Sequence, residues 1–372
     1  MTEKRVTWDE LNAHMTDMVA DKGIKIYVKD ELAPMKAVTI GNWSSLFFVN
    51  VNSEEIKHIA GDSKGDDWFE MHAAHANEAL KDADPERFEG MKKALLGLKK
   101  AYEDNGVTVI QYGLDSVPQN LEDMYMSASE QKFLSGYGKP GVPFVFGKHL
   151  LQTHEVTLTL PAIHLHLPVI KQLLSEPQNK DSAWLTMPIP QIDNTRQVSH
   201  WMSPGDPRLM PGNRILIGMG VDDPAKMRPG GPRSGADEPG IEMLRRMVEP
   251  YGFTVHTFFY NSSYSPHHDG VMFYVEEGLY ATTDDMIWPD QENLPKELTE
   301  WERITITPEE ARLGACNSMA LGNKRAIVTS SAPKLIEELE KRGHSVTPVD
   351  FAVGWETYLS GVMCCSMAMW RE

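Results

Sequence analysis

Residues 319–347 read MALGNKRAIVTSSAPKLIEELEKRGHSVT and contain two short apolar stretches around a turn, a helical stretch and a third apolar stretch. Gly322 lies in the turn, where a hairpin favours a residue that adopts positive φ. Gly343 follows the helical stretch, where a helix C-cap has the same requirement. The segment therefore predicts one unit made of a hairpin, a helix and a strand, with strands too short to be stable alone.

Both halves of this unit recur along the chain. A helix that ends in glycine before a short apolar strand is predicted again around Gly106 (LKKAYEDNGVTVI) and Gly252 (LRRMVEPYGFTVH). The hairpin pattern recurs around Gly147, Gly212 and Gly278. Recurring units of this size indicate stacked supersecondary elements that share a core. The alternative is an ordinary α+β fold that contains several hairpins.

The remaining segments suggest how the chain is divided. A short helix is expected over residues 8–19 and a strand over residues 24–28, so residues 1–30 are interpreted as an N-terminal extension. Residues 31–372 are expected to form a single domain, which opens with a strand that ends at Gly41. Residues 222–239 are rich in glycine, proline and charge, which predicts a long exposed loop.

The composition excludes several classes of protein. A hydrophobic fraction of 41% and a charged fraction of 24% over 372 residues are typical of a soluble globular protein. The formal net charge of -17 argues against nucleic-acid binding, which needs clustered basic residues. The acidity either serves solubility or attracts a cationic substrate. No apolar run is long enough for a membrane span or a signal sequence, so we expect a cytoplasmic protein with no membrane partner.

The cysteines concentrate attention on the C-terminus. The chain has only Cys316, Cys364 and Cys365, a set that does not form a disulfide framework and fits a reduced compartment. The last two lie in SGVMCCSMAMWRE, after a small residue and before an apolar strand. A thiolate in such a position is a competent nucleophile once its pKa is lowered. The alternative is that these cysteines are ordinary core residues.

Polar residues also precede two other predicted strands. In SPHHDGVMFYV, His267 or His268 is a candidate general acid and base, and Asp269 stands beside them. Asp206 lies at the entry of the hairpin around Gly212, either as a turn residue or as a carboxylate partner of the histidine or of the substrate. Histidine pairs in MHAAHANEAL and AIHLHLP have no further ligands at a convincing spacing, so no metal site is expected. No phosphate-binding glycine motif is found, and no cofactor is expected.

Taken in order, these segments resemble the guanidino-group-modifying enzymes, in particular the branch that contains the amidinotransferases and the arginine deiminases. ELAPMKAVTIGN resembles the opening strand of that family, and GDPRLMPGNRILIGMG resembles its Gly-Asp hairpin. The stretch that ends in HHDG resembles the His-x-Asp segment of the amidinotransferases. GVMCCSMAMWRE resembles the end of the deiminases. The resemblance implies an α/β fold, namely a five-bladed pseudo-symmetric propeller of ββαβ units.

The resemblance also implies roles for individual residues. Cys364 is expected to be the nucleophile, His267 the general acid and base, and Asp206 the acid that pairs with this histidine. Asp269 is expected to hold the guanidinium group of the substrate. Two small residues before the thiol, Ser360 and Gly361, are expected to let the substrate approach closely.

The sequence departs from the family pattern at two substrate contacts. The family has an Arg-Asp pair early in its second unit, but residues 135–147 (SGYGKPGVPFVFG) contain no aspartate. The strand after the His-x-Asp motif ends in TTDDM, where amidinotransferases often place an arginine. Because the nucleophile and the base are retained, these departures suggest an altered substrate, and the donor need not be arginine.

The expected activity is transfer of an amidino group from a guanidino donor, arginine or an analogue, to an amine acceptor through an amidino-thioether on Cys364. One alternative is a hydrolase that acts on a guanidino or amidino compound. Another is a non-catalytic binding protein on the same scaffold, which would have no need for Cys364, His267, Asp206 and Asp269 together. The resemblance also suggests a homodimer.

Overall fold

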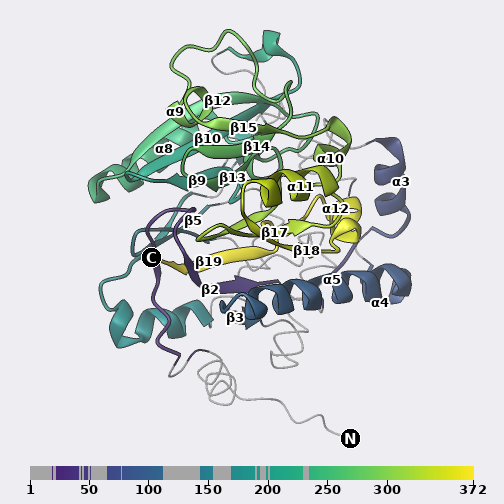
Figure 1. Cartoon of the computed structure of the whole chain (residues 1–372), viewed down its shortest axis with the longest axis horizontal. Coiled ribbons are helices and arrows are strands. Elements are labelled where there is room, and N and C mark those ends of the chain that lie inside the picture. The colour runs from purple at the N-terminus through teal and green to yellow at the C-terminus, as the bar shows by residue number, and fades with distance from the viewer. Residues whose placement is uncertain are drawn as a thin grey trace, which may run out of the picture.

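The computed structural model of the chain (Figure 1) describes most of the protein outside several segments. The described residues are 19, 22–41, 43, 46–48, 51, 65–76, 78–111, 143–153, 169–188, 191–192, 198–199, 202–228 and 234–372. The helix expected over residues 8–19 lies outside them, apart from its last residue. No helix in the described part of the chain has the length and apolar character that crossing a bilayer requires.

Helices and short strands alternate along the described chain. The strands are β1 (Tyr27–Val28), β2 (Met35–Ile40), β3 (Thr108–Gln111), β4 (Pro143–Phe146), β5 (His149–Gln152), β6 (Trp184–Thr186), β7 (Gln191–Ile192), β8 (Val198–Ser199), β9 (Pro207–Met210), β10 (Arg214–Val221), β11 (Ser234–Gly235), β12 (Thr254–Asn261), β13 (Phe273–Glu276), β14 (Leu279–Thr282), β15 (Glu302–Thr305), β16 (Met319–Gly322), β17 (Arg325–Thr329), β18 (Ser345–Val349) and β19 (Ser366–Arg371). The α-helices are α3 (Asp66–Ala74), α4 (Leu80–Ala83), α5 (Pro85–Asp104), α8 (Glu238–Val248), α9 (Lys296–Thr299), α10 (Pro308–Arg312), α11 (Pro333–Lys341) and α12 (Ala352–Tyr358). Short 3-10 turns are η4 (Pro177–Asn179), η5 (Pro224–Lys226), η6 (Glu249–Tyr251) and η7 (His268–Gly270).

One strand pattern is shared by five of the sheets formed by the described residues. In each, a central strand pairs antiparallel with one neighbour and parallel with the other. The five groups are β19-β2-β3, β4-β5-β6, β9-β10-β12, β13-β14-β15 and β16-β17-β18. The fold is therefore a mixed α/β fold built from similar units, as the recurring sequence patterns predict.

Glycines with positive φ end the helices and the hairpins where the sequence predicts them. Gly106, Gly252 and Gly343 have φ values of 75°, 84° and 81°. The hairpin residues Gly147 and Gly322 have φ values of 51° and 73°. Non-glycine residues adopt this region only at a cost, so these positions fix where each unit turns.

The last described strand completes the first sheet. β19 pairs antiparallel with β2 and parallel with β1, although these strands lie at opposite ends of the chain. Figure 1 shows the yellow β19 beside the purple β2. The opening of β19 at Ser366 follows Cys364 by two residues. The sheet that joins the two ends of the chain therefore also positions the predicted nucleophile.

Buried side chains from neighbouring sheets form shared cores. One core combines side chains of β4, β5, β10 and β19, a second combines β10, β12, β14 and β17, and a third combines β2, α5, β16 and β19. Burying apolar surface is the main favourable term in folding. Each unit is therefore stabilised by contacts with its neighbours, because its own short strands enclose too little apolar surface.

Two expectations need correction. The strand expected over residues 24–28 is reduced to β1, because the backbone of Ile24 and Ile26 is hydrogen-bonded to the side chain of Asn179 instead of to a strand. The long loop expected over residues 222–239 is interrupted by η5 and by β11, which pairs with β10, and α8 begins inside it. Ser234 and Gly235 are buried, so this part of the segment is not an exposed loop.

Candidate active site

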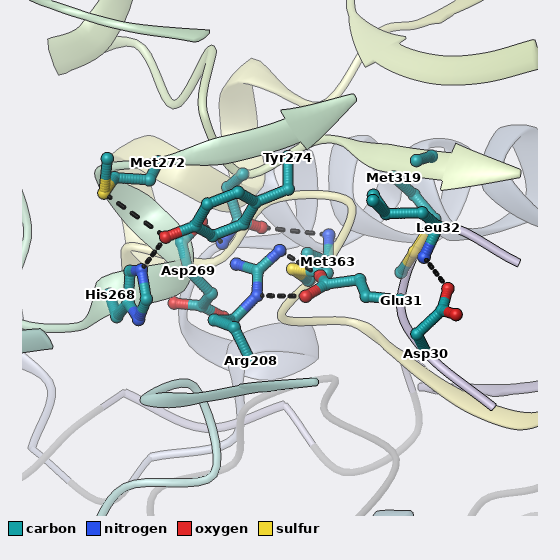
Figure 2. Close-up of polar contacts among 12 residues, drawn as sticks. Asp30, Glu31, Leu32, Arg208, His268, Asp269, Met272, Tyr274, Met319 and Met363 are labelled. Atoms are coloured by element: carbon teal, nitrogen blue, oxygen red, sulfur yellow. Dashed lines mark hydrogen bonds and ion pairs between the residues drawn. The ribbon is translucent and has the colours of Figure 1, made fainter. Parts of the chain in front are cut away.

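A cavity of about 140 Å³ lies where the start of the domain, the loop before β9, the turn η7 and the loop before β19 meet. Its wall includes Cys364 and Asp269, together with Glu31, Arg208 and Arg371. Figure 2 shows Asp269, Arg208 and Glu31 close together, with the Arg208 guanidinium group between the two carboxylates. The cavity therefore combines a thiol with two acidic and two basic side chains.

Cys364 lies on the turn between α12 and β19. The helix ends at Tyr358, its C-cap residue Leu359 adopts φ 52°, and the chain then turns before the strand begins. The Cys364 side chain is half-buried, and its Sγ donates a hydrogen bond to Asp269 Oδ2 at 3.2 Å. Cys316 and Cys365 are both fully buried. Cys364 is therefore the cysteine that the structure brings to the cavity.

Asn317 holds the nucleophile turn in place. Its Oδ1 accepts hydrogen bonds from the backbone N–H groups of Met363 and Cys364, both at 3.0 Å. Its Nδ2 donates to Cys364 Sγ at 3.1 Å and to the backbone carbonyl of Asp269 at 3.2 Å. A donor directed at sulfur favours the thiolate over the thiol. The sequence reasoning did not identify this residue.

Gly361 and Ser360 precede the thiol, and both are buried. A Cβ atom at Gly361 would lie 2.7 Å from Asn317 Oδ1, so glycine is needed for Asn317 to approach the turn. Ser360 Oγ lies 3.4 Å from the carbonyl oxygen of Tyr358, to which it donates. Contact of either residue with a substrate stays a prediction.

Asp269 lies on η7, within the His-His-Asp stretch. Its backbone N–H donates to the carbonyl of Gly205 at 3.0 Å, and a Cβ atom at Gly205 would lie 2.8 Å from the Asp269 carboxyl carbon. The side chain is 4% exposed. Its Oδ1 has no hydrogen-bond partner among the described residues, whereas Oδ2 accepts from Cys364. Asp269 therefore has a free acceptor atom beside the nucleophile.

Asp206 fixes the turn that carries the histidines. This fully buried carboxylate accepts hydrogen bonds from the backbone N–H groups of Ser203 at 3.0 Å and His268 at 3.4 Å. A Cβ atom at Gly235 would lie 2.6 Å from Asp206 Oδ1, so β11 packs directly against this carboxylate. His267 is 6% exposed and begins the same turn. Its function as acid and base stays a prediction.

His268 is fully buried and contacts two residues near the cavity through its ring nitrogens. Its Nδ1 lies 3.0 Å from the Asp206 carbonyl oxygen, and its Nε2 lies 2.9 Å from the Tyr274 hydroxyl. Burial and the nearby positive charge of Arg208 hold the pKa of His268 well below its ordinary value of 6.5. His268 is therefore neutral at physiological pH.

A buried ion pair forms one wall of the cavity. Arg208 Nε donates to Glu31 Oε2 at 2.7 Å, and Arg208 Nη2 donates to Glu31 Oε1. Burial alone would lower the pKa of Arg208, but Glu31 and then Asp269 raise it above its ordinary value. Arg371 is also buried and donates to the carbonyls of Ala33 and Ala320. Neither arginine was identified as a site residue from the sequence.

The second unit supplies apolar side chains to this cavity in the described part of the chain. Phe144 and Val145 of β4 line it. Most of the stretch in which the family has an aspartate, residues 135–142, lies outside the described residues. Glu31 is thus the second carboxylate that the structure shows at the cavity.

A positional signal in the sequence points to some of these residues. Asp206, Asp269, Asn317 and Cys364 each lie one to four residues before a strand that pairs antiparallel with a neighbour, namely β9, β13, β16 and β19. A comparison of the units would have identified Asn317 from the polar pair in CNSMALG. Among the described residues, no group of three or more histidine, cysteine or acidic side chains is placed to hold a metal ion.

The chain shares its fold with solved structures of guanidino-group-modifying enzymes, also called penteins. Two of the similar structures are amidinotransferases: SxtG from the saxitoxin biosynthetic pathway of Microseira wollei and the inosamine-phosphate amidinotransferase StrB1 from Streptomyces griseus. SxtG has a TM-score of 0.68 and 14% identity over 93% of this chain and 97% of its own. StrB1 has a TM-score of 0.67 and 17% identity over 94% of this chain and 97% of its own.

A hydrolase also shares the fold. The N-terminal domain of ArgZ, an arginine dihydrolase of the cyanobacterial ornithine-ammonia cycle, has a TM-score of 0.55 and 11% identity over 90% of this chain and 97% of its own. No protein-family model and no curated protein sequence matches the chain. At these identities the structural likeness establishes the fold, and the chemistry must be argued from the site.

Proposed function

We propose that the protein modifies a guanidino or amidino group through a covalent intermediate on Cys364. The observation that carries this proposal is the contact of the Cys364 thiol with the Asp269 carboxylate, 3.2 Å apart in the wall of a cavity. A guanidinium group is recognised through charge-assisted hydrogen bonds to a carboxylate. A guanidinium bound to Asp269 would therefore lie beside the sulfur.

The reaction that follows has two halves. The thiol proton passes to His267, the Cys364 sulfur bonds to the guanidinium carbon, and the bond from that carbon to the leaving nitrogen breaks. His267 returns its proton to the leaving amine, and an amidino-thioether remains on the enzyme. A second nucleophile then attacks the same carbon, and His267 accepts its proton. The sulfur leaves as a thiolate and takes this proton back from His267, which regenerates the enzyme.

We favour an amine as the second nucleophile, which makes the protein an amidinotransferase. One observation that supports this choice is the structural comparison. The amidinotransferases SxtG and StrB1 superpose with TM-scores of 0.68 and 0.67, whereas the ArgZ hydrolase domain superposes with a TM-score of 0.55. The stretch from α8 to η7 also resembles the amidinotransferases in sequence. With water as the second nucleophile, the same site would be a hydrolase, and the deiminase-like ending CCSMAMWRE favours that candidate.

We further propose that the five similar sheets close into a propeller around the cavity. One shared core links the sheets β19-β2-β3, β4-β5-β6 and β9-β10-β12. A second links β9-β10-β12, β13-β14-β15 and β16-β17-β18, and a third links β16-β17-β18 with β19-β2-β3. In such a ring, the residues that precede the strands would point toward a common centre.

The test is incubation with a panel of guanidino compounds, including arginine, with and without a mixture of small primary amines, followed by mass spectrometry of the products. Amidinotransfer predicts product only when an acceptor amine is present. Amine-independent release of a urea-containing product, such as citrulline from arginine, would identify a hydrolase instead. If the protein converts none of the guanidino compounds, and its product spectra are identical to those of the Cys364→Ala variant, both activities are contradicted.

A further inference from the structure

Two buried polar atoms at the cavity lack partners among the described residues. One is Arg208 Nη1, a donor on a side chain that is 3% exposed, and the other is Asp269 Oδ1, an acceptor. Both residues line the cavity. Leaving a buried polar group unpaired is unfavourable, and more so for a charged group. A ligand that binds here is therefore favoured if it pairs with both atoms.

A guanidinium group satisfies only one of the two atoms. It carries N–H donors and has no acceptor, so it pairs with Asp269 but repels Arg208. The other two nitrogens of Arg208 already donate to Glu31. The unpaired Arg208 Nη1 is therefore satisfied only if the same ligand carries a hydrogen-bond acceptor at a short distance from its guanidinium.

The charges around the cavity favour an anionic acceptor. The carboxylates of Glu31 and Asp269 are balanced by the guanidinium groups of Arg208 and Arg371, so the wall as a whole is neutral. Arg371 is 1% exposed and donates to two carbonyls and a sulfur atom, and burial lowers its pKa to about 10. A cationic ligand alone would add an uncompensated buried charge, which is unfavourable. A ligand that carries one positive and one negative group leaves the cavity neutral.

The positions of the two unpaired atoms limit the separation of the two groups. Arg208 and Asp269 line the same cavity, and their side chains lie close together (Figure 2). A long donor such as arginine carries its carboxylate at the far end of a flexible chain, which would have to fold back for one molecule to pair with both atoms.

We infer that Arg208 determines specificity by binding an anionic group of the donor, and that the donor is a compact guanidino or amidino acid. In such a molecule the anionic group is separated from the amidine by one or two carbon atoms. The inference rests on the proposed function for the chemistry at Cys364, but it concerns binding and can be measured separately.

The test compares ligands of matched shape. Guanidinoacetate is a compact zwitterion, isobutylguanidine has the same shape without the negative charge, and arginine places the charge at a distance. Each is titrated as protection of Cys364 against iodoacetamide in the Cys365→Ala background. We expect guanidinoacetate to protect Cys364 at concentrations at least about tenfold lower than those that isobutylguanidine or arginine requires, given the strength of hydrogen bonds to charged groups.

The double variant Glu31→Gln/Arg208→Gln assigns this preference to the buried pair. It keeps hydrogen-bonding groups in place and removes both charges, so it avoids leaving one buried charge alone. We expect the preference for guanidinoacetate over isobutylguanidine to fall by about tenfold. The matched control is Glu302→Gln/Arg342→Gln, which removes a surface pair whose Nη2–Oε1 distance is 2.7 Å and should retain the preference. Thermal unfolding of each variant confirms that it is folded.

The outcomes separate the inference from the proposed function. Equal protection by guanidinoacetate and isobutylguanidine, or tightest protection by arginine, would overturn the inference. A preference that survives in the folded Glu31→Gln/Arg208→Gln variant would overturn the role of Arg208. Preferential protection by guanidinoacetate without any covalent adduct on Cys364 would support the inference and contradict the proposed function.

Discussion

The properties of the Cys364 thiol depend on the two side chains that contact its sulfur. Asp269 Oδ2 accepts from it at 3.2 Å, and Asn317 Nδ2 donates to it at 3.1 Å. The carboxylate alone would disfavour the negatively charged thiolate, and the amide donor opposes that effect. Asn317 is therefore a positioning residue whose chemistry, and not only its shape, matters for the reaction.

Asn317→Asp tests this balance. The new side chain still accepts from the backbone of Met363 and Cys364, but it places a negative charge beside the sulfur. We expect alkylation of Cys364 at neutral pH to slow by about tenfold or more, with its pH dependence moved to higher pH. The control is Asn105→Asp, because Asn105 donates to Ala101 and Thr347 in another part of the molecule. An unchanged pH profile for Asn317→Asp would show that this amide does not influence the thiol.

The buried His268 predicts how stability depends on pH. Its pKa lies well below 6.5 in the folded protein because of burial and Arg208, whereas the unfolded chain takes up the proton near 6.5. The unfolded state therefore binds more protons as the pH falls, and the stability present above about pH 6.5 is lost progressively below it. The pKa values of His149, His256 and His344 are also lowered, chiefly by burial, and act in the same direction.

Urea unfolding at a series of pH values checks this prediction. For each such histidine, the free energy of unfolding should fall by up to about 1.4 kcal/mol per pH unit below the unfolded-state pKa. His268→Gln should show a shallower loss than the unsubstituted protein. A free energy of unfolding that rises as the pH falls from neutrality would contradict the assignment.

At the scale of elements, the turns between them determine the geometry of the site. The turn before β19 is closed by the contact between Gly361 and Asn317, and the turn before β13 by the contact between Gly205 and Asp269. Both glycines allow approaches that a Cβ atom would block. The two turns then meet at the contact between Cys364 and Asp269.

Gly361→Ala should separate the two turns. The added methyl group would lie 2.7 Å from Asn317 Oδ1, so Asn317 must move away from the nucleophile. We expect alkylation and turnover to fall by about tenfold or more, with a loss of stability of about 1–3 kcal/mol from overpacking. Gly65→Ala is the control, because its Cβ would meet nothing within 4 Å. Full activity in Gly361→Ala would show that the site tolerates displacement of this amide.

The sequence predicts best those elements whose ends are determined by nearby residues. Glycines that need positive φ mark the ends of α5, η6 and α11 and the turns of the hairpins, and the structure confirms them. The prediction of an exposed loop over residues 222–239 was wrong in part. The composition of this segment is that of a loop, whereas the burial of Ser234 and Gly235 depends on β10 and Asp206 elsewhere in the chain. Local composition does not report such a tertiary contact.

At the scale of the whole molecule, the site combines residues from both ends of the chain. Arg208 and Glu31 are separated by 177 positions, and Cys364 and Asp269 by 95. The Cys364 and Asp269 positions were identified because their motifs resemble those of a known family. Arg208 and Glu31 also lie in stretches that resemble that family, GDPRLMPGNRILIGMG and ELAPMKAVTIGN, but the resemblance assigned them no role.

The central claim is that Cys364 forms a covalent amidino adduct, and acid quenching during turnover tests it most directly. The protein is mixed with guanidinoacetate or arginine, quenched, digested and analysed by mass spectrometry, with Cys364→Ser and Cys365→Ala variants in parallel. The account predicts one amidino group on the peptide that carries Cys364, retained in Cys365→Ala and lost in Cys364→Ser. Product formation by Cys364→Ser, or an adduct on Cys365 instead, would contradict it.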